Sequence, residues 1–184
     1  MTHPLIGEAM KKAAVAWIAP GDAGDPDTGG PPGRGGTRGP DAVDAAPRLL
    51  WCLVAEDVLW VVTGPGEQEA PGLALASRAR VTLRGDHGGR VVTWPATVSR
   101  VEPGSEQWEQ VVPQLATKRL NAPGDAESLA SRWAAECTVL KLAPAGDPLE
   151  AGPTLPDGRL AHPPRETPAR RRTRRPFRLH RVRR

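Results

Sequence analysis

A glycine loop followed by a row of arginines makes residues 60–84 the part of the sequence best suited to hold an anion. The loop Thr-Gly-Pro-Gly at 63–66 follows an apolar, β-rich run and precedes a short predicted helix. Backbone N–H groups at such a junction can bind an anion. Arg78, Arg80 and Arg84 alternate along the next strand, so they project to one face, and arginine binds phosphate and carboxylate bidentately. A phosphate or carboxylate site is one interpretation, and a turn followed by surface arginines is the other.

Other titratable side chains give weaker signals. Glu67 and Glu69 in the loop are interpreted as a solvated loop face, with an acid/base pair as the alternative. His87 is the only interior candidate for a nucleophile–base pair, and its setting, Gly-Asp-His-Gly-Gly, predicts an exposed turn. Lys118 and Arg119 suit the C-terminal end of a helix, with a second cationic contact as the alternative. No side chain stands out as a catalytic acid or base.

Two cysteines, Cys52 and Cys137, are interpreted as buried, reduced thiols. Each has apolar neighbours in the sequence, and their spacing matches no disulfide or redox motif. A zinc site needs more ligands than two cysteines and four scattered histidines readily supply. We therefore expect no metal site.

Composition separates a folded body from segments that cannot form a core. Hydrophobic residues make up 39% of the 184 residues, with 21 Pro and 20 Gly, whereas an average globular chain is about 45–50% apolar. The apolar residues lie mostly between 48 and 143. We predict one domain over 1–144 with a flexible Gly/Pro-rich insertion at 20–47, and a disordered tail at 145–184 that is first Pro-rich and then Arg-rich.

The net charge of +4 comes from this tail. Residues 165–184 contain ten Arg and one Glu, a charge of +9, which leaves −5 for residues 1–164. The tail could neutralise nucleic-acid phosphates in a salt-dependent way. Its single aromatic residue, Phe177, does not give the interleaved stacking of single-strand binders. Non-specific nucleic-acid contact and a disordered tail without that role are the two alternatives.

The N-terminal segment is predicted to be an amphipathic helix rather than a signal peptide. Apolar residues fall at helical spacing over 4–14, the lysines come late in the segment, and Glu8 precedes them. No apolar run approaches the roughly 18–20 residues of a membrane span. We therefore expect a cytoplasmic protein with no membrane contact.

The rest of the pattern alternates short strands with helices. Runs at 49–55 and 58–63 flank the polar pair Glu56-Asp57, as in a β-hairpin. A long strand from 90 contains Pro95, which marks an edge or a bulge, and Ser105 can N-cap the next helix. The other predicted elements are a strand ending at 19, a short helix over roughly 70–77, a strand near 79–84, a helix kinked or restarted at Pro113, a helix at 127–136 and a strand at 137–144. Five or six mainly antiparallel strands with helices at the seams favour a mainly β, α+β barrel.

Several of these stretches resemble the FMN-binding split-barrel family related to pyridoxamine 5′-phosphate oxidase, in its actinobacterial form. The similar stretches are LLWCLVAEDVLWVVTGPG, LASRARVTLR, GGRVVTWPATVSRVEPGSEQWEQVVPQLATKRLN and RWAAECTVLKL, and the resemblance covers about residues 1–143. It implies a six-stranded antiparallel split β-barrel, usually a homodimer with a flavin at each subunit interface. Members of the family oxidise or reduce small molecules with FMN, and relatives use a deazaflavin coenzyme or haem.

The resemblance also implies which residues lie near a cofactor. In this family the strand matching 50–52 runs beside the flavin ring, and a threonine matching Thr63 lies near the ring or the ribityl chain. The cofactor-binding residues expected on this basis are Leu50, Trp51, Cys52, Thr63, Gly64, Arg78, Arg84 and Trp94. At family positions for a serine, a Lys or Arg and an Asn-Leu pair, the chain has Glu69, Pro71, Ala74 and Leu75. Arg78, Arg84 or an arginine of the partner subunit would then replace the missing cation at the FMN phosphate. Otherwise FMN binding has been lost.

Two functions from different classes follow. The first is an oxidoreductase that uses FMN or a deazaflavin coenzyme to act on a small-molecule substrate, in which the protein positions the flavin and the cofactor carries the hydride. The second is a non-catalytic split-barrel dimer that has lost FMN and binds a small ligand or a partner. Nucleic-acid association through the tail is a third, for which the body offers no recognised reading module.

Overall fold

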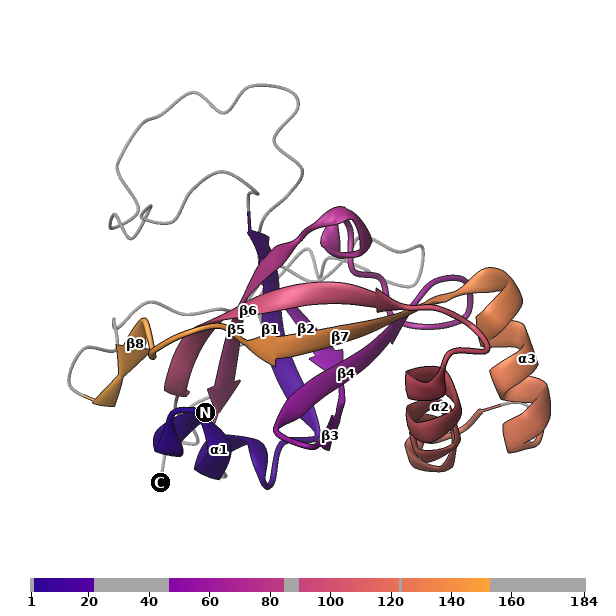
Figure 1. The fold of residues 1–184 in the computed structure, drawn as a ribbon, viewed down its shortest axis with the longest axis horizontal. Coiled ribbons are helices and arrows are strands. Elements are labelled where there is room, and N and C mark those ends of the chain that lie inside the picture. Colours follow the sequence, from indigo (N-terminus) through magenta and orange to yellow (C-terminus); the bar gives the residue numbers. More distant parts are fainter. Residues whose placement is uncertain (1, 22–46, 85–89, 123, 153–184) are drawn as a thin grey trace, which may run out of the picture.

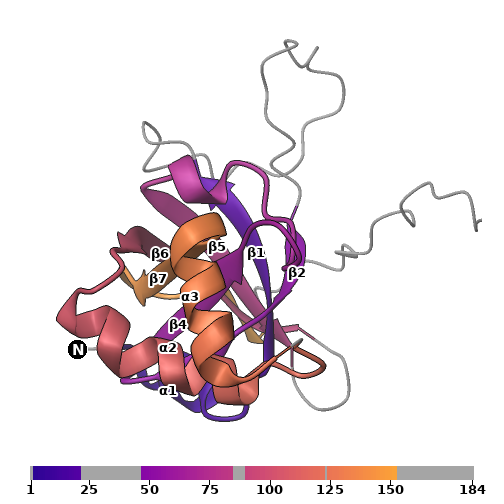
Figure 2. The ribbon, with the colours of Figure 1, turned by 90° about the vertical axis from the view of Figure 1, so that its right-hand side faces the viewer.

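An antiparallel sheet curls into a barrel, and two helices cover one side of it (Figures 1 and 2). The computed structural model describes residues 2–21, 47–84, 90–122 and 124–152. The strand order is β2-β1-β5-β6-β7-β4-β3, with β8 paired to β6. The strands are β1 Val15–Gly21, β2 Arg48–Trp51, β3 Leu53–Ala55, β4 Val58–Thr63, β5 Arg78–Arg84, β6 Arg90–Val101, β7 Thr138–Pro144 and β8 Glu150–Ala151.

The barrel is joined where the chain run 48–55 changes its pairing partner. β2 pairs with β1, and β3 pairs with β4. Between them, Cys52 donates its backbone N–H to the carbonyl of Ala14 at 2.9 Å. Because β2 and β3 stand at the two ends of the strand order, this single run connects both edges of the sheet. The mainly antiparallel α+β barrel predicted from sequence is confirmed in this coarse form.

The described residues form eight strands, whereas the sequence predicted six. One difference is the split of the predicted strand 49–55 at Cys52, where the partner changes. The other is β8, which lies in the segment from 145 that the sequence predicted to be disordered, so that prediction is wrong for Glu150 and Ala151. There Leu149 donates its N–H to the carbonyl of Thr93 at 2.8 Å, next to the β8–β6 pairing. The prediction missed β8 because two residues are too few to show an alternating pattern.

Pro95 lies at a gap in the sheet although β6 itself has neighbours on both sides. Its carbonyl accepts a hydrogen bond from Ala145 at 2.9 Å, just past the end of β7. β8 pairs with β6 only at Val92 and Thr93. A proline has no N–H to give to a ladder, and at this position neither β7 nor β8 lies opposite it. Pro95 thus has an edge position on the β7 and β8 side of β6, while Arg80 of β5 lies opposite it on the other side.

The helices are α1 Pro4–Met10, α2 Glu106–Lys118 and α3 Ala126–Glu136, and a 3-10 helix, η1, spans Leu73–Leu75. α1 ends earlier than the predicted residue 14, because the chain turns toward β1 with Ala13 bonded to the Met10 carbonyl. Ser105 caps α2 as predicted, accepting from Trp108 N–H at 3.2 Å. α2 continues through Pro113 as one helix, so the alternative of a second helix starting there is wrong.

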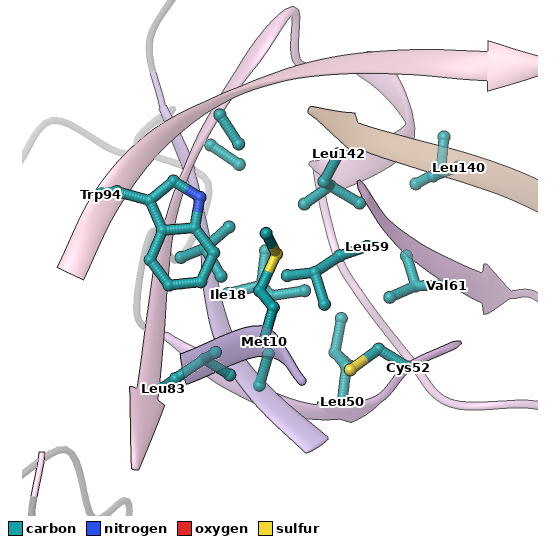
Figure 3. Close-up of a cluster of buried hydrophobic side chains, with 14 of the residues drawn as sticks. Met10, Ile18, Leu50, Cys52, Leu59, Val61, Leu83, Trp94, Leu140 and Leu142 are labelled. Atoms are coloured by element: carbon teal, nitrogen blue, oxygen red, sulfur yellow. The ribbon is translucent and has the colours of Figure 1, made fainter. Parts of the chain in front are cut away.

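Two apolar clusters hold these elements together. The first fills the barrel, where side chains from α1 and six strands point toward one another (Figure 3). Ile6 and Met10, one helical turn apart, pack α1 onto this cluster. The second lies between the outer face of the barrel and the helices, and it includes Trp60, Trp108 and Trp133. The buried face of α2 belongs to this second cluster.

Some predictions concern residues outside the described ranges. These are the insertion over 22–46, the turn at 85–89 with His87, and the tail from 153. The first two residues of the predicted insertion, Pro20 and Gly21, belong to β1, so the sheet extends further than predicted at that end. Among the described helices, none has the length and apolar character that crossing a bilayer requires.

Candidate functional site

The loop after β4 is fixed at its start by close packing against the end of α3. Gly64 has a φ of 143°, and a Cβ there would lie 2.9 Å from the Cα of Cys137. Gly66 has a φ of 75°, and a Cβ there would lie 3.0 Å from a guanidinium nitrogen of Arg132. Both values lie in the region that favours glycine. Contact with the protein's own chain therefore accounts for glycine at both positions.

The anion in this loop is a side chain of the protein itself. Glu67 has a side chain only 1% exposed, between α2 and α3. Its Oε2 accepts from Arg119 Nε at 2.8 Å, and its Oε1 accepts from Arg132 Nη2 at 2.5 Å and from Trp133 Nε1 at 3.0 Å. The prediction of a solvated loop face is wrong for Glu67. Lys118 and Arg119 lie at the C-terminal end of α2, as the preferred interpretation placed them, and the guanidinium of Arg119 contacts this internal carboxylate.

The charge of Glu67 is stabilised by these donors. Burial on its own would raise the pKa of the carboxyl. The hydrogen bonds from Trp133, Arg119 and Arg132 outweigh burial and hold the pKa of Glu67 below its ordinary value. A buried carboxylate with three donors remains ionised at neutral pH. Glu67, Arg119, Arg132 and Trp133 are called the Glu67 cluster below. Its carboxylate and two guanidinium groups sum to a net charge of +1, and the indole is neutral.

The next residue, Gln68, closes the gap between β2 and β4. Its side-chain Oε1 accepts from the backbone N–H of Trp51 at 2.7 Å, and its Nε2 donates to the Trp51 carbonyl at 2.9 Å. On its other side, Thr63 Oγ1 donates to the Gln68 carbonyl at 2.9 Å, and the two residues form a parallel bridge. Gln68 thus acts as a one-residue strand at the place where the run 48–55 changes partner.

The arginines of β5 do not meet at one point. Arg78 and Arg84 are the first and last residues of the strand, so about 20 Å of extended chain separates them. Arg84 lies over Trp17, with 5.2 Å from its guanidinium carbon to the ring centroid. Arg78 and Arg80 are exposed on the same face of β5. One phosphate cannot be held by Arg78 and Arg84 of the same chain.

Three of the expected cofactor residues point into the barrel. Leu50, Cys52 and Trp94 are 2%, 6% and 0% exposed and belong to the interior cluster (Figure 3). Burial raises the pKa of the Cys52 thiol to about 12, so it carries no thiolate at neutral pH. Cys137 is also buried, and burial raises its pKa as well. Both cysteines are free thiols, as predicted.

Two tryptophans and two apolar residues form the outer face of β1 and β2. Val15 lies opposite Trp51, and Trp17 lies opposite Leu49. Val15 and Leu49 are 50% and 51% exposed, and both tryptophans are half-buried. Arg119 lies over Trp51 at 6.0 Å from the ring centroid, as Arg84 does over Trp17. These four residues are called the β1–β2 outer face below.

A hollow of about 60 Å³ lies between the β3–β4 turn, β7 and α2, with Glu56, Trp60, Gln110 and Lys141 in its lining. It is far smaller than a flavin and does not include the expected cofactor residues. No group of three or more His, Cys, Asp or Glu side chains suited to a metal occurs in the described part of the chain.

Comparison with known proteins identifies the fold. No protein-family model and no curated protein matches the sequence. HutZ, a heme storage protein from Vibrio cholerae, superposes with a TM-score of 0.50 and 16% identity, covering 79% of this chain and 91% of that one. A putative pyridoxamine 5′-phosphate oxidase from Listeria innocua has a TM-score of 0.46 and 11% identity, covering 77% and 91%. A putative 5-nitroimidazole antibiotic resistance protein from Bacteroides thetaiotaomicron has a TM-score of 0.45 and 11% identity, covering 79% and 82%.

The chain therefore has the split-barrel fold of pyridoxamine 5′-phosphate oxidase-like proteins, as the sequence resemblance implied. At these identities the likeness concerns the fold. The site residues that sequence reasoning missed are Gln68, Arg132 and Trp133. Arg132 and Trp133 lie 65 and 66 residues from Glu67 along the chain. The sequence offered only an indirect signal for the two arginines, because a glutamate requires cationic partners if it is buried.

Gly64→Ala should lower the free energy of unfolding by about 2 kcal/mol or more, because a positive φ and a 2.9 Å contact with backbone cannot both be relieved. Gly7→Ala in α1 is the matched control, since nothing lies within 4 Å of a Cβ there. Chemical denaturation of both variants measures the difference. Equal stability of the two variants would contradict the close packing of the loop.

Glu67→Gln should destabilise the fold by about 2–3 kcal/mol at pH 7, because it leaves two partly buried arginines without their counter-charge. The folded-state pKa of Glu67 lies below its ordinary value of 4.5. The loss of stability in Glu67→Gln relative to wild type should therefore be complete above pH 4.5. It should shrink as the pH falls through the lowered pKa. Urea denaturation from pH 7 to pH 3 tests this, and a difference that grows on acidification would refute it.

Proposed function

We propose that this protein is a cytoplasmic oxidoreductase that uses a flavin-type cofactor, FMN or a deazaflavin coenzyme, to act on a small molecule. The observation that carries the proposal is the β1–β2 outer face, on a split-barrel fold. There two half-buried indoles lie diagonally across adjacent strands, each with a guanidinium above its ring. Indoles suit a planar aromatic ring, and guanidinium groups suit a phosphate or carboxylate.

The fit of the cofactor to the residues is uneven. Trp17 and Trp51 would stack with the ring system, and Arg84 would pair with its anionic end. The Glu67 cluster adds a net positive charge beside Trp51. The loop at 64–69 does not suit the phosphate, because its own carboxylate already takes Arg119 and Arg132. Arg78 lies at the other end of β5 from Arg84, so it would serve a different ligand group or a partner's site.

Hydride transfer would be the chemistry of the bound cofactor. The chain's own residues would bind and orient it. The backbone N–H and carbonyl of Trp51 are taken by Gln68, so the strand offers its indole and not its peptide groups. Cys52 lies behind this strand as an unionised thiol, and it would bring no charge near the ring.

A second copy of the chain would complete the site. Val15 and Leu49 leave about half of their surface exposed beside the two indoles, and a homodimer that covers this face would enclose the cofactor between subunits. The resemblance to this family also implies a homodimer. The hollow near Trp60 is too small to take this role.

The second candidate is a non-catalytic split-barrel dimer that binds another small ligand. Two observations favour it: Glu67 fills the cationic recess beside the strand, and Gln68 takes the free peptide groups of Trp51. Each would compete with a phosphate-bearing ligand.

Addition of FMN or of the deazaflavin coenzyme should quench the tryptophan fluorescence of the purified protein. Arg84→Ala should weaken that binding about tenfold or more, since a charged hydrogen bond is lost. Arg100→Ala is the matched control, because this exposed arginine lies on β6 and pairs with Glu102. If the protein is colourless and neither coenzyme quenches it, the redox proposal fails and the second candidate replaces it.

Leu49→Asp should convert the dimer to a monomer, because a charge would be buried at the centre of the subunit contact. Leu75→Asp is the control, since Leu75 is 94% exposed on η1 and is not one of the four residues of this face. Light scattering after size-exclusion chromatography measures the mass of each variant. A wild-type protein that is monomeric at all concentrations, or a dimeric Leu49→Asp variant, would contradict the proposed interface.

A further inference from the structure

We propose that Arg119, Arg132 and the indole of Trp133 form a carboxylate-binding site that the chain keeps closed with its own Glu67. The site would take a small molecule or a chain end that carries a free carboxylate. Such a ligand must displace Glu67 to enter. This inference does not rest on the proposed cofactor.

The donors of this site match a planar carboxylate. Arg119 reaches one oxygen of Glu67, and Arg132 and Trp133 reach the other, at distances of 2.5–3.0 Å. Both oxygens therefore accept hydrogen bonds. One guanidinium group comes from the C-terminal end of α2 and the other from α3. Charge-assisted contacts of this kind are stronger than neutral ones. The recess is built for a group with two coplanar oxygens and one negative charge.

Each donor is held in place by a contact that does not involve Glu67. Arg132 Nη1 donates to the carbonyl of Pro65 at 2.7 Å. Arg119 lies over the ring of Trp51 and donates to the carbonyl of Leu120. Trp133 is 0% exposed in the second apolar cluster. Each donor therefore has a second contact that would help to keep it oriented when the Glu67 side chain is displaced.

The recess lies close to solvent. The side chains of Arg119 and Arg132 are 24% and 25% exposed, whereas that of Glu67 is 1% exposed. Glu67 is a residue of the loop that joins β4 to η1, and no helix or strand includes it. An external carboxylate can therefore meet the arginines from outside, and the loop residue is the group that must move.

Displacement of Glu67 would also affect the barrel. Gln68, the next residue, holds both backbone groups of Trp51. A ligand that moves Glu67 outward draws Gln68 with it, which frees the peptide edge of Trp51 between β2 and β4. The Glu67 cluster is in this sense an autoinhibitory contact, and a carboxylate ligand is the signal that releases it.

Thermal unfolding of Glu67→Ala in sodium acetate or formate tests this inference, with sodium chloride at equal ionic strength as reference. The variant should unfold at a lower temperature than wild type in chloride. Acetate should raise its Tm saturably, by about 2–4 °C, as expected for a ligand that binds only the folded state. Wild type should gain less, because Glu67 competes with the added anion.

Two variants act as controls at pH 7. Glu69→Ala removes an exposed loop carboxylate and should show no acetate-specific gain over wild type. Glu67→Ala combined with Arg132→Ala should lose the gain. The proposal is overturned if acetate stabilises wild type and Glu67→Ala equally, or if the double variant keeps the full effect. Inorganic phosphate that stabilises Glu67→Ala as strongly as acetate would overturn the assignment to carboxylates.

Should Glu67→Ala fail to fold in chloride, refolding from urea gives the same test. The proposal predicts recovery of the folded state when acetate or formate is present during refolding. Equal failure in acetate and in chloride would overturn it.

Discussion

One buried carboxylate decides the path of the chain after β4. Glu67 must meet positive donors because an isolated ion in the protein interior is very costly. The donors come from the end of α2 and from α3, so these contacts join the loop to both helices. Hydrophobic residues at all the positions of this cluster could give equal stability, whereas loss of Glu67 alone would leave two arginines without a counter-charge. The ion pair instead specifies one position for the loop and brings Gln68 to Trp51.

This arrangement changes how the glycine loop is understood. Its glycines and nearby cations indicated a cradle for an external phosphate, but the glycines serve close packing and the effective cations are Arg119 and Arg132. The anion is internal. On the β1–β2 outer face, guanidinium groups lie over the indoles of Trp17 and Trp51.

Local signals in the sequence were enough to predict most elements. The hairpin around Glu56 and Asp57 formed as expected, and both residues have a positive φ that this tight turn requires. Ser105 capped α2. The site was less predictable, because its contacts join residues far apart: Gln68 and Trp51 are separated by 17 positions, and Glu67 and Arg132 by 65. Only tertiary packing brings such residues together, and their spacing carries no period that a sequence pattern could show.

The ionisation of Glu67 is the most direct test of this account. A carbon-13 NMR titration of glutamate side-chain carboxyl groups, with Glu67→Gln used to assign the resonance, measures its pKa in the folded protein. We predict a midpoint below the ordinary glutamate value of 4.5, because three donors favour the charged form. A midpoint at or above that value would show that Glu67 is not held by Arg119, Arg132 and Trp133, and would contradict the account.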